Sequence, residues 1–231
     1  MMVNQKSVLR GLTLVAGLVA GLASVAQGAM AYEGGDLILR AGVASVQPEE
    51  DSSALKLNGG ALAGTRAGVD NSAQLGLTAT YMLTPHVGVG VLAASPFEHD
   101  IRATGLGIDA GKIKHLPPTF TLQYFPLDGG SAFQPYIGVG INYTVFFSEH
   151  VDSELEAALG SSGDLDMDNS FGWAVQAGAD YALDDHWVVN AAVWYLDIDT
   201  DATFRFDSGD RVTAQVDIDP WVYMIGLGYR F

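Results

Sequence analysis

The 231-residue sequence contains no cysteine, and this absence excludes several kinds of chemistry at once. Without thiols the chain forms no disulfide bond, no thiolate metal site and no cysteine nucleophile. Basic residues are also scarce, because 11 Lys and Arg stand against 27 Asp and Glu and leave a formal net charge of −16. A phosphate backbone requires clustered positive charge, so we do not expect nucleic acid as a partner.

Long hydrophobic runs are rare as well, and the one that stands out lies near the N-terminus. Two basic residues precede an apolar stretch over residues 11–26, and small residues follow up to Ala31. This order is typical of a secretory signal peptide. The stretch is rich in Gly and Ala and shorter than the roughly 20 strongly apolar residues of a spanning helix. We therefore expect a signal peptide over residues 1–31 and a mature domain over 32–231, with an uncleaved membrane anchor as the alternative.

The rest of the chain is dominated by an alternation of apolar and polar residues with period two. Such segments, separated by clusters of Gly, Pro, Asp and Asn, predict β-strands. The expected strands are residues 36–47, 72–83, 86–97, 113–126, 134–148, 169–183, 186–205 and 211–231. An even number of strands, with short turns at one end and longer loops at the other, is typical of an outer-membrane barrel whose termini face the periplasm. We predict an all-β fold, an eight-stranded antiparallel transmembrane β-barrel.

Two of the connections between these strands are long enough to have structure of their own. The stretch "DSELEAALG" over residues 152–160 begins with an Asp N-cap and ends with Gly, so it predicts a short helix in an extracellular loop. The region over residues 51–69 is rich in Gly and Ala, and we expect a mobile loop there.

The polar and apolar faces of the last two expected strands exchange places partway along each strand. From Trp221 to Phe231 the odd positions are apolar over 11 residues, close to the roughly 9–11 that a tilted strand needs to cross the hydrocarbon. Before Trp221 the odd positions become polar and the even positions apolar, and the strand over 186–205 shows the same exchange. We therefore expect apolar side chains to face lipid within the membrane and to face the lumen beyond it.

This exchange predicts an apolar lumen beyond the membrane, where a water-filled porin would have a polar one. The channel-lining residues that we predict are Trp194, Leu196, Ile198, Val216, Ile218, Pro220, Val222 and Met224. Closer to the periplasm the inward residues include Arg40, Asp180 and Asn190, and buried charges in so narrow a barrel should pair or find water. We interpret them as a packed polar plug, with an ion-conducting pathway as the alternative.

Three prolines interrupt the third and fourth expected strands. Pro96 ends the third strand, and Pro117 and Pro118 lie in the fourth. If the hairpin centre is near Leu106, Pro96 falls almost opposite Leu116 and Pro117. Each proline removes a donor from the ladder, so the three together predict a lateral opening from the lumen to the lipid. A bulge that re-aims the strands is an equally good interpretation.

The same hairpin carries a candidate histidine site. We expect His99 and His115 to approach one another across it, with Glu98 close by. A hydrolase there would need a serine nucleophile within reach of a histidine, and no motif supports Ser95, the nearby serine. The histidines of the chain also lack metal-ligand spacing. We therefore expect no enzyme, no metal and no cofactor.

Acidic residues form two further candidate sites. The stretch "DLDMDN" over residues 164–169 is similar to the start of a calcium-binding loop, but Asn169 stands where Gly is required and the later Glu is missing. On the seventh expected strand, Asp197, Asp199 and Asp201 predict a solvated outer face. Divalent-ion bridging to lipopolysaccharide is the alternative interpretation.

Several stretches of the mature chain carry a resemblance to a known family. They are "YEGGD" (32–36), "SPFEHDI" (95–101), "KHLPPT" (114–119), "PYIGVGINYTVFF" (135–147), "SFGWAVQAGADY" (170–181) and "IDPWVYMIGLGYRF" (218–231). Together they closely resemble the outer membrane protein W family, which includes alkane-uptake relatives. The sequence departs most from the family over residues 51–69, which are longer and richer in Gly than expected.

The resemblance implies an eight-stranded barrel with a hydrophobic channel that admits small apolar molecules and releases them sideways. Pro96, Pro117 and Pro118 match the family at its kinked strands, and Phe231 matches the signal read by the barrel assembly machinery. We therefore expect a passive channel for small hydrophobic solutes in the outer membrane of a Gram-negative bacterium, in contact with lipid and lipopolysaccharide. The alternative is a structural or surface-interaction barrel with a closed lumen; a lipid-modifying enzyme and a soluble lipocalin-type barrel fit the sequence less well.

Overall fold

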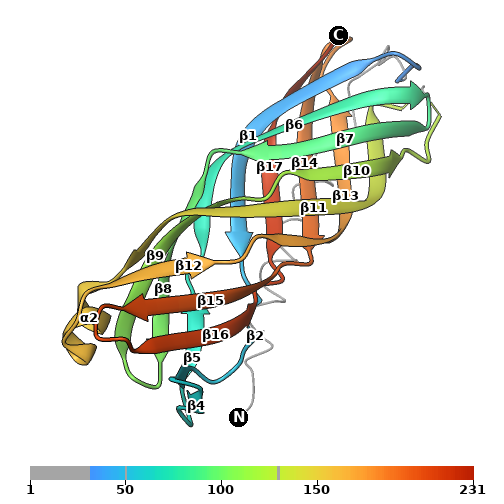
Figure 1. Cartoon of the computed structure of the whole chain (residues 1–231). Helices are drawn as coiled ribbons and strands as arrows, with labels where there is room; N and C mark the ends of the chain where they lie inside the picture. Colours follow the sequence, from blue (N-terminus) through green and yellow to red (C-terminus); the bar gives the residue numbers. More distant parts are fainter. Residues whose placement is uncertain (1–31, 50, 129–130) are drawn as a thin grey trace, which may run out of the picture.

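The computed structural model describes residues 32–49, 51–128 and 131–231, and these form one elongated β-barrel (Figure 1). The signal peptide that the sequence predicts lies outside the described residues. The C-terminus lies at one end of the barrel, at the top of Figure 1, and helix α2 (Ser153–Leu159) lies at the opposite end. Between the two ends the wall consists of two parts that follow one another along the barrel axis.

The part that contains the C-terminus is a closed barrel of eight strands, which we call the transmembrane barrel. Its strands are β1 (Leu37–Gln47), β6 (Ser72–Thr84), β7 (Val87–Ala94), β10 (Thr119–Tyr124), β11 (Phe133–Val151), β13 (Ser170–Ala182), β14 (Trp187–Leu196) and β17 (Trp221–Arg230). They follow the order β10-β7-β6-β1-β17-β14-β13-β11, and β10 also pairs with β11. This last pairing closes the ring, so each of the eight strands pairs with a neighbour on both sides.

The part at the other end continues the same wall, and we call it the extension. Its strands are β2 (Asp51–Ser52), β3 (Lys56–Leu57), β4 (Gly60–Ala61), β5 (Arg66–Val69), β8 (Phe97–Thr104), β9 (Ile108–Leu116), β12 (Gly163–Met167), β15 (Asp199–Phe206) and β16 (Arg211–Asp217), together with the end of β11. Most expected strands therefore continue into the extension after a short break. The third and fourth also reach further than the sequence predicted, because β8 runs to Thr104 and β9 begins at Ile108.

The prediction of an unstructured mobile loop over residues 51–69 is wrong. The structure has four short strands there: β2 and β3 pair with β16, β3 pairs with β4, and β5 pairs with β8. Each of these strands has only two to four residues, too few to show the alternation by which strands are recognised in a sequence. Their backbone groups are satisfied by the neighbouring longer strands, which the local composition does not reveal.

The predicted helix is confirmed as α2 (Ser153–Leu159). The Asp152 side chain caps it by accepting a hydrogen bond from the backbone N–H of Glu154 at 3.0 Å. Gly160 ends it in the left-handed conformation, with φ of 65°, where glycine has no steric penalty. Leu155 is the buried residue of the helix and faces the barrel interior. Among the described residues, no helix is long and apolar enough to cross a membrane.

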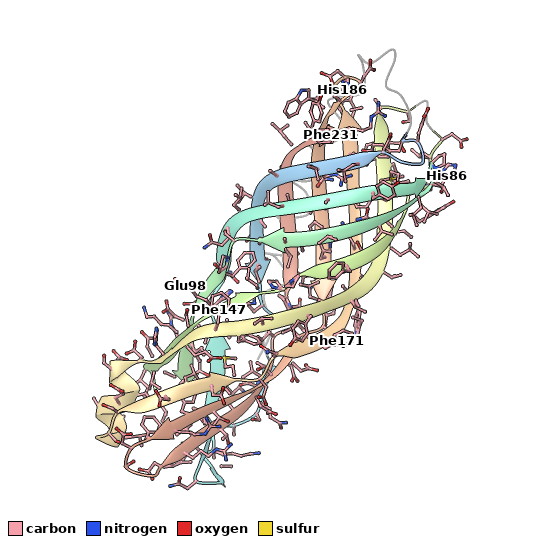
Figure 2. All side chains as sticks on the ribbon, turned by 45° about the horizontal axis from the view of Figure 1, so that its top comes forward. His86, Glu98, Phe147, Phe171, His186 and Phe231 are labelled. Carbon is pink, nitrogen blue, oxygen red and sulfur yellow. The ribbon has the colours of Figure 1, made fainter. Side chains whose placement is uncertain are left out.

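The predicted exchange of faces is confirmed. In the transmembrane barrel Ile225 is 66% exposed and Met224, next to it, is 1% exposed; in the extension Val216 and Ile218 are buried while Asp217 is exposed. The outward side chains of the transmembrane barrel form an apolar band edged by aromatic rings. Figure 2 shows Phe231 at one edge and Phe171 at the other, where the extension begins. Such a band with aromatic edges is the surface of a barrel that spans a bilayer.

The interior of the transmembrane barrel holds a buried charged pair, and we call this pair with its hydrogen-bond partners the polar floor. Arg40 and Asp180 are 2% and 1% exposed and form a two-bond ion pair, with 2.9 Å between Arg40 Nε and Asp180 Oδ1. Arg40 also donates to Thr80 at 2.8 Å, and the hydroxyl of Tyr32 donates to Asp180 at 2.7 Å. The buried charges are thus paired and hydrogen-bonded, as a packed plug requires.

We predict that Asp180→Ala lowers the free energy of unfolding by about 3–5 kcal/mol, because it leaves the Arg40 guanidinium buried without its partner. The double variant Arg40→Met/Asp180→Leu should lose less, since no charge then remains buried. Urea unfolding in lipid bilayers measures both. As a control, Asp166→Ala removes an exposed pair with Arg205 and should cost less than about 1 kcal/mol. Equal losses for Asp180→Ala and the double variant would contradict this view of the floor.

Candidate functional site

The extension encloses an apolar cavity of about 90 Å³, which we call the outer cavity. Strands β3, β5, β8, β9, β12, β15 and β16 and helix α2 all contribute to its wall. Arg102 is the one lining residue with a charged or polar side chain, and that side chain forms ion pairs with Asp70 and Asp109. The cavity therefore offers dispersion contacts and removal from water and no charge to a bound molecule.

The alternation of side chains along the strands produces this lining. In β15 Ala202 and Phe204 point inward, and in β16 the inward positions are Val212, Ala214 and Val216. These positions carry small or apolar residues, while the positions between them are polar and outward. Helix α2 closes the far end with two leucines and an alanine that lie over the cavity: Leu155, Ala158 and Leu159.

Sequence reasoning missed the part of the lining that comes from residues 51–69. These residues supply Leu55, Leu57, Leu62, Ala67 and Val69 to the cavity. One feature of the sequence could have indicated them. Leu55 and Leu57 are two residues apart, as are Ala67 and Val69, and this spacing is a single step of the alternation of a strand.

All eight predicted channel-lining residues are buried, but they lie in different places. Val216 lines the outer cavity, and Val222 lines a second, much smaller cavity described below. The others are packed at or near the level where the extension joins the transmembrane barrel: Trp194, Leu196, Ile198, Ile218, Pro220 and Met224. Trp194 lies opposite Val222 across the β14–β17 ladder, and Leu196 and Ile198 are each 0% exposed. We call this packed layer, to which Val222 also belongs, the neck.

The three prolines lie where the wall loses its regular pairing. The ladder of β7 with β10 ends at Leu92 opposite Thr119, and the ladder of β8 with β9 begins at Phe97 opposite His115. Between these two pairs, one strand advances by five residues, from Leu92 to Phe97, while the other advances by four, from His115 to Thr119. The register therefore changes by one residue, as in a β-bulge. In this described stretch no backbone pair joins residues 93–96 to 116–118.

A small cavity of about 10 Å³, which we call the gap cavity, lies at this break in pairing. It is lined by Ala94, Phe97 and Pro117 from the interrupted strands and by Val222 from the neck. The interior of the barrel and the interrupted part of its wall therefore meet at one place. The bulge and the loss of backbone pairing occur together at the prolines. The two interpretations of the prolines, a bulge that re-aims the strands and a lateral opening, are therefore compatible.

The predicted approach of His99 and His115 is confirmed. Their Nε2 atoms lie 3.0 Å apart, and both side chains are buried on the inner face of the extension, at 3% and 2% exposed. Gly105 and Gly107, both with positive φ, form the turn of this hairpin and place its centre at Leu106 as expected. Burial lowers the pKa of His99 and lowers the pKa of His115 to about 3, so the pair is neutral at pH 7.

The other groups expected near this pair do not join it. Glu98 points outward and lies 3.5 Å from Lys114 in an exposed ion pair. The Ser95 hydroxyl donates to Gln74 at 3.2 Å. Within the part of the chain that the structure describes, no group of three or more His, Cys, Asp or Glu residues could hold a metal ion. Ser95, Glu98 and the two histidines therefore do not form an arrangement of nucleophile, base and orienting carboxylate.

The acidic segments lie on the outer face of the extension. Residues 164–167 belong to β12, where Asp166 pairs with Arg205 at 3.2 Å, so the resemblance to a calcium-binding loop does not extend to the fold. Asp199 lies opposite Asp217 in the β15–β16 ladder. Partial burial and the charges of Asp217 and Asp197 raise the pKa of Asp199. These carboxylates form a negative surface just beyond the apolar band.

Comparisons with known proteins agree with this architecture. The model of the OmpW family matches residues 33–231. Outer membrane protein W of Escherichia coli is 46% identical over 208 residues, which cover 88% of this chain and 92% of the relative. Outer membrane protein W of Vibrio cholerae is 44% identical over 207 residues, with 87% and 91% covered. Outer membrane protein AlkL of Ectopseudomonas oleovorans is 26% identical over 204 residues, with 87% and 84% covered.

A solved structure supports the same assignment. The crystal structure of the outer membrane protein OprG from Pseudomonas aeruginosa superposes with a TM-score of 0.83 at 47% identity, covering 87% of this chain and 98% of that chain. The fold is thus that of an outer-membrane barrel, located in the outer membrane of a Gram-negative bacterium and surrounded by its lipids. The chain belongs to the OmpW family.

Proposed function

We propose that the protein is a passive channel through which small hydrophobic molecules cross the outer membrane. The observation that carries this proposal is the position of the outer cavity: a space lined almost entirely by apolar side chains lies beyond the membrane, and a charged, hydrogen-bonded floor lies in the barrel below it. A polar solute gains nothing in the cavity, and an apolar solute cannot pass the floor. The route that remains for an apolar solute leads through the wall.

The cavity provides the driving force for capture. Removal of apolar surface from water stabilises a bound molecule by roughly 25 cal/mol per Å², and this holds for any small apolar body without a specific recognition group. A cavity of about 90 Å³ suits a short hydrocarbon chain or a small ring. Capture of this kind needs no energy input and no covalent step.

The lateral opening at Pro96, Pro117 and Pro118 is the exit in this proposal. The absence of paired backbone between residues 93–96 and 116–118 lowers the cost of separating the two strands. The gap cavity already places Val222 of the neck beside Pro117. A solute that passes the neck residues predicted as channel lining would then enter the bilayer at this height, and the apolar band of the barrel surface faces the same lipid.

Two partners belong to the same proposal. Phe231 is 66% exposed at the end of the last strand, where the barrel assembly machinery could bind it as the family resemblance implies. The carboxylates around Asp199 and Asp217 lie beyond the apolar band, and in this proposal they face the lipopolysaccharide head groups.

One observation favours a second candidate function, a surface-interaction barrel with a closed lumen. Helix α2 covers the end of the outer cavity with Leu155 and Leu159, and the neck below is tightly packed. In this reading the apolar interior only stabilises the extension, and function resides in its outer surface.

We predict that Val216→Asp reduces the initial uptake rate of a small alkane at least about tenfold, because a carboxylate without a partner in the cavity costs on the order of 1–3 kcal/mol when apolar solute replaces its water. The matched control is Gln215→Asp, which places the same group on the outer face of the same strand. Uptake of radiolabelled alkane by cells that express each variant measures the effect. Equal uptake by the two correctly assembled variants favours the closed-lumen barrel.

We predict that a disulfide across the interrupted wall blocks release. Because the chain has no cysteine, the double variant Ala94→Cys/Pro117→Cys contains one thiol pair, and both positions line the gap cavity. Oxidation should stop alkane uptake and reduction should restore it. The control pair Val91→Cys/Phe120→Cys crosses a position that is already paired and lies outside the gap cavity, and oxidation there should leave uptake unchanged. Unchanged uptake in the oxidised Ala94→Cys/Pro117→Cys variant would rule out the exit at this position.

A further inference from the structure

The histidine pair lies between the outer cavity and the gap cavity. Along β8 the inward row is Phe97, His99, Ile101 and Ala103. Phe97 lines the gap cavity, whereas Ile101 and Ala103 line the outer cavity. His99 therefore stands at the step between them, with His115 beside it on β9. A molecule that moves along this wall from one cavity to the other passes the two imidazoles.

The hydrogen bonds of the pair fix the positions of its protons. The carbonyl of Asp70 can only accept, so Nδ1 of His99 carries a proton and donates to it. In a neutral ring the Nε2 of His99 is then an acceptor, and the proton between the two Nε2 atoms belongs to His115. The remaining nitrogen, Nδ1 of His115, therefore has a free lone pair.

This lone pair has no donor among the described residues, although His115 is 2% exposed. The neighbouring side chains are aromatic: the rings of Phe97 and Phe146 lie 5.6 and 5.8 Å from the His115 ring, centre to centre. A buried acceptor without a donor costs free energy, and an otherwise apolar wall gains nothing structural from it. A strong neutral acceptor between two apolar cavities is suited to a molecule that brings a donor.

We propose that Nδ1 of His115 is a recognition site for apolar molecules that carry one hydrogen-bond donor, a hydroxyl or an N–H group, as they pass from the outer cavity to the gap cavity. The inference rests on the proposed function, because it names a solute class for the same channel. The apolar body of such a solute occupies the outer cavity and its donor binds the lone pair. A hydrocarbon passes without this contact, and a molecule that has only acceptors gains nothing from it.

Two isomers test this contact, octanol and heptyl methyl ether, because they have the same atoms and only octanol has a donor. The ¹⁵N resonance of His115 Nδ1 is recorded for the protein in lipid nanodiscs. It should start at the position of an unprotonated nitrogen without a hydrogen bond and move toward the hydrogen-bonded position when octanol is added, but not when the ether is added. A resonance that is already hydrogen-bonded without solute, or that ignores octanol, overturns the inference.

Uptake by cells separates the inference from the proposed function. Relative to the unmodified protein, His115→Phe should lower the ratio of octanol to ether uptake about fivefold, the size expected for one lost hydrogen bond. His115→Asn keeps an acceptor near the same place and should restore part of the ratio. His150→Phe, at an exposed position on β11, should leave the ratio unchanged.

The outcomes are distinct. If neither isomer enters faster than in cells without the protein, the proposed function fails, and the nitrogen resonance still decides whether His115 binds a donor. If both isomers enter and His115→Phe leaves their ratio unchanged in a folded barrel, the recognition site is wrong and the channel stands. If His115→Phe does not fold, the resonance of the unmodified protein decides.

Discussion

The structure depends on one constraint, that hydrocarbon offers no hydrogen-bonding partner to the backbone or to a polar side chain. Within the bilayer the strands must therefore close on themselves, and the β10–β11 pairing completes the ring. The outward positions of these strands must also be apolar, which sends the polar residues inward. Arg40 and Asp180 then share a narrow interior and neutralise one another there. The polar floor is thus a consequence of the apolar outer surface that the lipid requires.

Beyond the bilayer the requirement on the outward side chains is the opposite, because water and not lipid surrounds the wall of the barrel. The outward positions of β15 and β16 become acidic and polar, and the inward positions become apolar without any change in strand register. The apolar residues have no lipid to face, so they gather around the outer cavity. One chain therefore has an apolar outside where lipid surrounds it and an apolar inside where water surrounds it, and the break in strand pairing near the prolines lies between these two parts.

Much of the fold could be predicted from the sequence. The period-two pattern, and the place where its polar and apolar positions exchange, can both be recognised within a single short segment of the chain. The eight strands, the exchange at Trp221, helix α2 and the approach of His99 to His115 all follow from spacing within single strands or one hairpin. Contacts across the barrel could not be predicted in the same way. Ile198 and Val216 are both inward and apolar, yet one is packed in the neck and the other lines a cavity, since the difference depends on side chains from distant strands.

Residues 51–69 show the other limit. Strands of two to four residues show at most one or two steps of alternation, too few to identify a strand, and they form because β16 and β8 offer free backbone groups to pair with. Leu55 and Leu57 then become part of the cavity wall. For the same reason the partners of Arg40 could not be identified from the sequence. The alternation places Arg40 inward, but its partners Thr80 and Asp180 come from strands that are distant along the chain.

The most direct test of the account is to locate an apolar solute on the protein. Nuclear Overhauser contacts between a protonated alkane and the methyl groups of the deuterated barrel in nanodiscs would do this. The account predicts contacts to Ile101 and Val216 of the outer cavity and to Val222 beside the gap, and none to Thr80 at the polar floor. Contacts confined to outward residues such as Ile225 would show that the alkane stays in the lipid, and would contradict the account.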